Sequence, residues 1–138
     1  DLILTVHSSE PVGHLYQGKG HTSPEILWRF IQEYPSVNIV CSHWGGGLPF
    51  YALMPEVREG LSNVYFDTAA SPFLYSSQIF QIVSQLVGSK RMLLGSDFPL
   101  IEAGRVLNQI KHSSLTSVEK KDVSGGTALN LLRALITN

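Results

Sequence analysis

Four short apolar runs recur along the chain, and a helix-like segment follows each of them. The runs are rich in β-branched, aliphatic or aromatic residues and cover residues 2–7, 37–43, 64–67 and 91–97. Apolar segments of this length, bounded by polar residues or glycine, are typical of strands buried on both faces of a parallel sheet. The pattern therefore predicts four strands, each at the start of a strand–helix unit.

The segments between the runs carry signals for the starts and ends of helices. Ser23-Pro24-Glu25 predicts a helix N-terminus, because serine suits the N-cap and proline the first helical position. Thr116 and Glu119 stand three residues apart, in the pattern of a capping box. Together with the apolar spacing, these signals predict helices near residues 24–34, 50–58, 72–87 and 116–136.

A polar residue with useful chemistry ends each predicted strand: His7, His43, Asp67 and Asp97. Successive members are 36, 24 and 30 positions apart, which matches strand–helix units of roughly 30 residues. Four such units make half of a (β/α)8 barrel, whose usual length is about 250 residues. The sequence thus predicts an α/β fold, half of a TIM barrel formed as one domain over residues 1–138, with an open doubly wound sheet as the alternative.

The ends of the first and last strands offer candidate metal ligands. Parallel α/β folds build their active sites at the carboxyl ends of the strands. His7 can bind a divalent metal through a neutral imidazole, and Asp97, in Gly-Ser-Asp97-Phe-Pro, can ligate the same ion or accept a proton from its bound water. Taken singly, His7 could instead bond the backbone and Asp97 could cap a helix.

His43 begins the run His43-Trp44-Gly45-Gly46-Gly47. Three glycines let the backbone turn sharply beside a ligand, and an imidazole held there suits general acid–base catalysis. The similar glycine run of alpha/beta-hydrolases is excluded, because the chain has no Gly-x-Ser-x-Gly motif. We expect Trp44 to contact substrate, and Asp67 either to orient His43 or His7 or to cap the next turn.

A long loop over residues 8–21 follows the first strand on the same face and could close over a substrate. We expect Glu10, His14 and Lys19 to bind substrate there, with His14 or Lys19 meeting a carboxylate. A solvated loop is the alternative for each of them.

Charge and cysteine content exclude several classes of protein. Ten basic and eleven acidic residues give a formal charge of −1 without a basic tract, which argues against nucleic-acid binding. No apolar run approaches the roughly 20 residues that span a bilayer. Cys41 has no second cysteine to pair with, and the first residues lack a basic leader and look like the inside of a strand. We expect a cytoplasmic protein whose chain begins within a larger fold.

Three motifs resemble the amidohydrolase-related family typified by aminocarboxymuconate-semialdehyde decarboxylase. They are a strand ending in His7, the His43-Trp-Gly-Gly turn, and Gly-Ser-Asp97-Phe-Pro, in that order; residues 123–132 look like the family's closing helix start, with Thr127 in place of the usual Asn. The resemblance implies the C-terminal half of a TIM barrel that binds zinc or a similar divalent ion, with His7 and Asp97 as ligands and His43 as the acid–base group. Members hydrolyse, hydrate or decarboxylate small carboxylated compounds, which are often aromatic.

The chain departs from the family in lacking any His-x-His pair, which the family carries on the first barrel strand. Two ligands fall short of the three that a catalytic zinc site normally has, and a half barrel leaves two sheet edges open. We therefore expect a homo-oligomer, most simply a dimer, or association with a missing N-terminal half. The expected function is a metal-dependent hydrolase or decarboxylase; the alternative is a non-catalytic half barrel that acts as an oligomerising or binding module.

Overall fold

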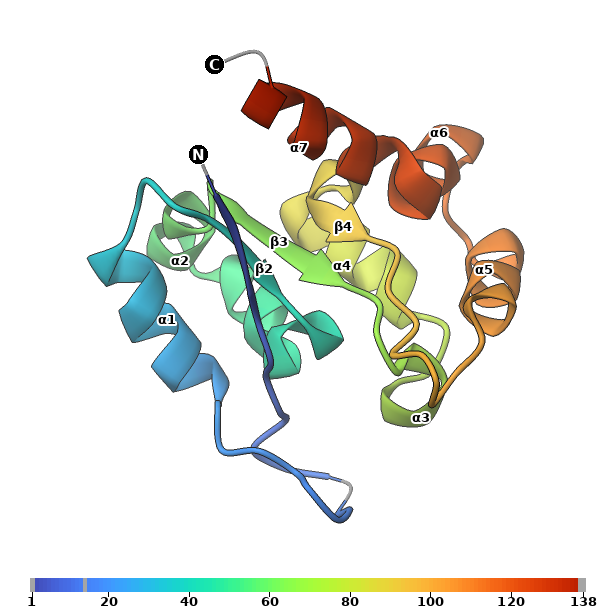
Figure 1. Ribbon diagram of the computed structural model, residues 1–138, viewed down its shortest axis with the longest axis horizontal. Helices are drawn as coiled ribbons and strands as arrows, with labels where there is room; N and C mark the ends of the chain where they lie inside the picture. Colours follow the sequence, from blue (N-terminus) through green and yellow to red (C-terminus); the bar gives the residue numbers. More distant parts are fainter. Residues whose placement is uncertain (1, 14, 137–138) are drawn as a thin grey trace.

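Four parallel strands form one sheet in the order in which they occur along the chain (Figure 1). The structure, a computed structural model, describes residues 2–13 and 15–136. The strands are β1 (Ile3–Val6), β2 (Asn38–Cys41), β3 (Val64–Asp67) and β4 (Met92–Leu93). All four predicted strands are confirmed, three of them shorter than their apolar runs. The order β1-β2-β3-β4 contains no reversal of direction across the sheet, which is the pattern of a barrel and differs from a doubly wound sheet with its switch point.

Helices connect successive strands. After β1 comes α1 (Pro24–Glu33), and after β2 come a 3₁₀ segment, η1 (His43–Leu53), and α2 (Pro55–Gly60). Between β3 and β4 lie α3 (Ser71–Leu74), α4 (Ile79–Val87) and η2 (Ser89–Arg91), and β4 is followed by α5 (Ala103–His112), α6 (Ser117–Lys121), the π-helical η3 (Asp122–Gly126) and α7 (Thr127–Ile136). The predicted helices are present, but the helix expected over residues 50–58 is split between η1 and α2, and that expected over 72–87 between α3 and α4.

Helix α5 was not predicted from the sequence. Its N-cap, Glu102, makes no side-chain capping hydrogen bond, and Gly104 stands in its first turn. Only Val106 and Ile110 are buried along it, so the apolar stripe is one turn long and too short to give a clear helical period.

The capping box ahead of α6 is confirmed. Thr116 accepts the Glu119 N–H, and the Glu119 carboxylate accepts the Thr116 N–H at 2.8 Å. The same carboxylate accepts a hydrogen bond from Ser84 on α4. These bonds, first that from Ser84 and then those from Thr116, lower the pKa of Glu119 below its usual value. Glu119 thus joins α6 to α4 as well as capping its own helix.

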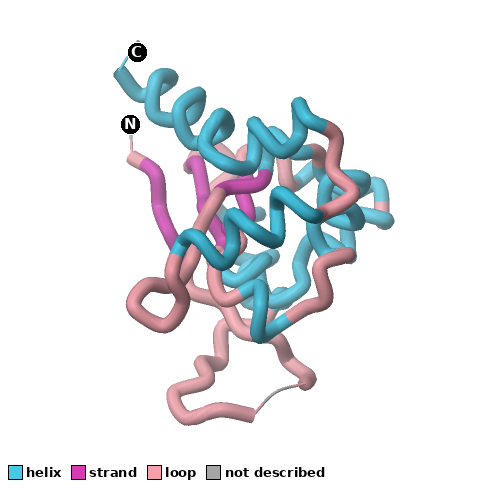
Figure 2. The backbone as a smooth tube through the Cα atoms, turned by 90° about the vertical axis from the view of Figure 1, so that its right-hand side faces the viewer, coloured by secondary structure: helices cyan, strands magenta, loops and turns pink. Residues whose placement is uncertain are grey.

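Both faces of the sheet carry apolar contacts. The larger core lies between the sheet and helices α1, η1, α2, α4 and α5, and it includes Ile39, Phe66 and Met92. On the other face, α7 packs Leu131 against Val40 and Leu93. Helix α7 lies toward the amino ends of the strands, whereas the loop after β1 projects at their carboxyl ends (Figures 1 and 2). The strand ends that carry the candidate site are therefore not covered by α7.

Strand β1 lies at one edge of the sheet and pairs only with β2 within the described residues. Leu2 and Leu4 beside this edge are 86% and 39% exposed, and Leu132 and Ile136 of α7 are also exposed. None of the described helices is long and apolar enough to cross a bilayer.

Candidate active site

The structure brings the two strand-end histidines together. His7 directly follows β1 and His43 follows β2 by two residues, and the parallel pairing of Val6 with Cys41 sets both at the same edge of the sheet. Their ring centroids are 4.9 Å apart with an interplanar angle of 73°, an edge-to-face arrangement. His7 is exposed, and its Nε2 lies 3.2 Å from Ser9 Oγ, whereas His43 is half-buried.

Asp67 at the end of β3 holds the backbone of His43. Its Oδ1 accepts hydrogen bonds from the N–H of His43 at 2.9 Å and from the N–H of Ala69 at 3.0 Å. Gly95 lies against this carboxylate, and a Cβ there would stand 3.2 Å from Asp67 Cγ. Asp67 was expected either to orient a histidine or to cap the next turn, and it does both. Its Oδ1 atom positions His43 through the His43 main chain and also caps the turn after β3.

The turn that presents His43 is left-handed over five residues. His43 and Trp44 each have a φ of 56°, and Gly45, Gly46 and Gly47 continue with positive φ. A left-handed backbone costs about 1–2 kcal/mol for a residue with a Cβ, and such strain is concentrated at functional sites.

Close contacts explain the glycines in this turn. A Cβ on Gly45 would lie 2.8 Å from the Phe66 ring, and one on Gly46 would lie 2.6 Å from the carbonyl oxygen of Ser9. The turn is therefore pressed against both β3 and the loop after β1, which a side chain at either position would prevent.

Trp44 does not occupy the substrate-contacting position that the sequence suggested. Its side chain is fully buried, meets the Phe80 ring edge-on at 5.3 Å and donates from Nε1 to Ser71 Oγ. The left-handed turn directs the indole into the core, where it anchors η1 to α3 and α4.

Asp97 follows β4 in an exposed position with a φ of 69°. Its carbonyl oxygen accepts the N–H of Leu100 at 2.8 Å, so its backbone closes a tight turn. No group of three or more His, Cys, Asp or Glu side chains within residues 2–13 and 15–136 could hold a metal ion. The donors of His7 and Asp97 suit a divalent metal in kind, but two are too few for a complete catalytic site.

The loop after β1 folds back onto His7. Ser9 N–H donates to the Thr22 carbonyl at 2.9 Å, and a Cβ on Gly20 would lie 3.2 Å from the His7 ring. Lys19 places its ammonium 5.9 Å from the centroid of the Tyr16 ring. Of the substrate-binding residues expected here, Glu10 is half-buried and lines a pocket, and His14 lies outside the described residues.

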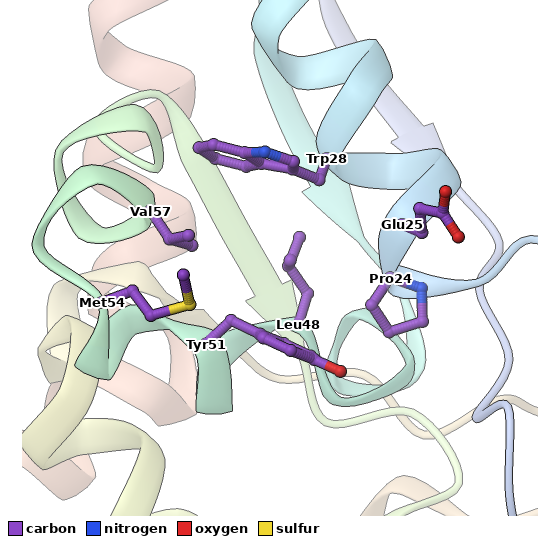
Figure 3. Close-up of a pocket in the computed structure, with 7 residues that line it drawn as sticks. All are labelled: Pro24, Glu25, Trp28, Leu48, Tyr51, Met54 and Val57. Carbon is purple, nitrogen blue, oxygen red and sulfur yellow. The ribbon is translucent and has the colours of Figure 1, made fainter.

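Several pockets lie near this end of the fold, and two of them border η1. One, of about 290 Å³, opens between α1, η1 and α2 and is lined mainly by apolar side chains (Figure 3). Its acidic residue, Glu25, is paired with Arg29 at 2.6 Å. The other, of about 400 Å³, lies beside the left-handed turn and includes Glu10 and Tyr75. No sequence motif points to Tyr75, which reaches the turn only through the fold.

Cys41 is not a nucleophile. The residue is fully buried at the end of β2, and burial, followed by the negative charge of Asp67, raises the pKa of its thiol to about 12. It is a small residue of the apolar core.

Known proteins with similar sequences are decarboxylases by name. The chain is 30% identical over 124 residues to 6-methylsalicylic acid decarboxylase of Penicillium expansum, covering 76% of this chain and 37% of that protein. It is 20% identical over 118 residues to gamma-resorcylate decarboxylase of a Polaromonas species, covering 73% of this chain and 36% of that protein. The chain thus spans little more than a third of the length of these relatives.

Solved structures show the same fold. A dihydroxybenzoic acid decarboxylase from Polaromonas, with bound manganese and the inhibitor 2-nitroresorcinol, matches with a TM-score of 0.65 and 18% identity over 80% of this chain and 38% of its own. A 5-carboxyvanillate decarboxylase from Sphingomonas paucimobilis matches with a TM-score of 0.63 and 17% identity over 78% of this chain and 37% of its own. The four strand–helix units therefore correspond to part of a TIM barrel. Since the amidohydrolase family model matches residues 1–134, the chain belongs to the amidohydrolase family.

Proposed function

We propose that this chain forms part of the active site of a metal-dependent decarboxylase that acts on a small aromatic carboxylic acid. The observation that carries the proposal is the His7–His43 pair, whose rings lie 4.9 Å apart at the carboxyl ends of β1 and β2. Family membership supports it, as do the three curated relatives, each named as a decarboxylase.

His43 is the proton donor in this proposal. Decarboxylation breaks the bond between the ring carbon and the carboxyl group, which leaves as CO2, and the ring carbon must gain a proton in its place. An imidazole titrates near neutral pH and can supply that proton. Asp67 keeps the ring at the strand edge by holding the His43 N–H, so Asp67 is a positioning residue.

His7 and Asp97 would hold the divalent metal, which would act as a Lewis acid toward the substrate's oxygen atoms. The solved relatives contain manganese by description, and zinc, the ion expected from the family resemblance, is a second choice. Because two ligands are too few, the remaining ligands would come from additional polypeptide or from a second copy of this chain. The open edge at β1 and the exposed Leu2 and Leu4 support such an association.

Metal content and turnover test the proposal together. The purified assembly is dialysed against Mn²⁺, its metal is measured by elemental analysis, and CO2 release from 2,6-dihydroxybenzoate is followed. We expect bound manganese in the wild type and its loss in Asp97→Asn. Asparagine tolerates the positive φ of this position, so the substitution should leave the backbone unchanged. We expect His43→Gln to keep the metal and to lose about 100-fold or more in rate. A His43→Gln protein with the full rate would remove His43 from the mechanism.

A non-catalytic module is the second candidate, and the incomplete ligand set within the described residues favours it. It predicts no stoichiometric manganese and no CO2 release. It also predicts an oligomer, seen by size-exclusion chromatography with light scattering, that Asp97→Asn leaves unchanged.

A further inference from the structure

We propose that the pocket beside the left-handed turn binds an organic ammonium group attached to a small apolar body. The pocket measures about 400 Å³, within the range of small-molecule sites. It lies between the loop after β1, the start of η1 and the segment after α3. The lining residues that carry the argument are Glu10, Gly46, Gly47, Phe50, Tyr51 and Tyr75.

The charge of this pocket is negative. Glu10 supplies a carboxylate, and the described residues that line this pocket include no lysine, arginine or histidine. Lys19 and His21 lie with Glu10 around the neighbouring pocket, on the side of the loop after β1. The Oε1 atom of Glu10 is buried and has no hydrogen-bond partner within the part of the chain that the structure describes. A buried carboxylate oxygen is costly unless it accepts a hydrogen bond, and an ammonium group carries both the donors and the opposite charge.

Tyr75 contributes a hydroxyl group to the pocket. Burial, the negative charge of Glu10 and a hydrogen bond to Glu10 all raise the pKa of the Tyr75 hydroxyl, in that order. The Tyr75 hydroxyl therefore keeps its proton and is available as a hydrogen-bond donor beside the Glu10 carboxylate.

Aromatic rings complete the wall. Phe50 and Tyr75 lie with ring centroids 6.1 Å apart at 62°, and Tyr51 lines the same pocket. Ring faces attract a cation within about 6 Å, most strongly when water is excluded. A carboxylate ligand would be repelled by Glu10, so this pocket differs in charge preference from the site proposed for the aromatic acid. It adjoins that site, because Glu10 and Gly46 each stand three residues after His7 and His43.

Calorimetric titration with three probes of one shape tests the charge preference. The probes are benzylammonium, the neutral benzyl alcohol and the anionic benzoate. We expect the wild-type chain to bind benzylammonium at least about tenfold more tightly than benzyl alcohol, since hydrogen bonds to a charged group are the stronger ones. Glu10→Gln should abolish that preference, and Tyr75→Phe should reduce it. Glu56→Gln, on the exposed face of α2, is the matched control and should leave all affinities unchanged.

Three outcomes would overturn the proposal: no benzylammonium binding, equal affinity for benzylammonium and benzyl alcohol, or a Glu10→Gln chain that keeps the wild-type preference. If Glu10→Gln fails to fold by circular dichroism, Tyr75→Phe decides the matter in the same way. The titration measures binding alone, so it stands whether or not the chain decarboxylates any acid.

Discussion

Replacing Asp67 by asparagine tests whether this carboxylate holds the left-handed turn that begins at His43. The substitution keeps the shape of the side chain and an acceptor oxygen, but it removes the charge. Oδ1 accepts two backbone hydrogen bonds, from His43 at 2.9 Å and from Ala69 at 3.0 Å. Both would change from charge-assisted to neutral bonds.

The cost follows from the difference between the two kinds of bond. A hydrogen bond to a charged group contributes about 1.5–3 kcal/mol and a neutral one about 0.5–1.5 kcal/mol. Two bonds that each lose about 1 kcal/mol should lower the free energy of unfolding by about 2 kcal/mol. For a chain of this size, that is a fall in Tm of roughly 6–10 °C.

Urea unfolding followed by tryptophan fluorescence would measure the loss, because Trp44 is buried next to His43. Asp97→Asn is the matched control: Asp97 also follows a strand but is exposed, and its change should stay within about 0.5 kcal/mol. The amide resonances of His43 and Ala69 should move in Asp67→Asn alone. Equal stability of the two variants would refute the role given to Asp67.

Three further predictions each concern one feature of the structure. Gly46→Ala places a Cβ 2.6 Å from a loop carbonyl at a φ of 59° and should cost about 2 kcal/mol or more in urea unfolding, whereas Gly104→Ala in α5, with open space around it, should cost nothing. Cys41, with its pKa raised to about 12, should not react with a disulfide reagent at pH 8 until the chain unfolds. Glu119→Gln should lower Tm, and the difference in Tm from the wild type should be largest at pH values above the ordinary glutamate pKa. That difference should vanish as pH falls through the lowered folded pKa, because protonation removes the same charge from the wild type.

The fold could be predicted to the level of its four strand–helix units because each strand reads as one apolar run, although β1 at the sheet edge is largely exposed whereas β2, β3 and β4 are mostly buried. The run at residues 91–97 gave a strand of two residues, because Gly95 to Asp97 leave the ladder to form the turn at Asp97. Helix α5 escaped prediction since only Val106 and Ile110 are buried along it.

The candidate site could be predicted where sheet register alone decides the geometry. His7 and His43 meet because parallel strands end together. Trp44 was wrongly placed, because the left-handed φ of 56° at His43 and Trp44 turns the indole into the core. A run of glycines predicts a turn, but it does not show that the two residues before it also adopt the left-handed backbone conformation. Tyr75 could not be found at all, since the sequence separates it from Glu10 by 65 positions.

The candidate site divides into a part that this chain holds firmly and a part that it leaves open. His43 is half-buried, and its backbone is fixed by a carboxylate from the neighbouring strand. His7 and Asp97 are exposed, and their side chains need further ligands before they could hold a metal. The part of the site around His43 should therefore keep its geometry in the isolated chain, whereas metal binding by His7 and Asp97 would depend on a partner at the open edge of β1. Association and metal binding should be coupled, because the same contacts that close the sheet would bring the missing ligands to His7 and Asp97.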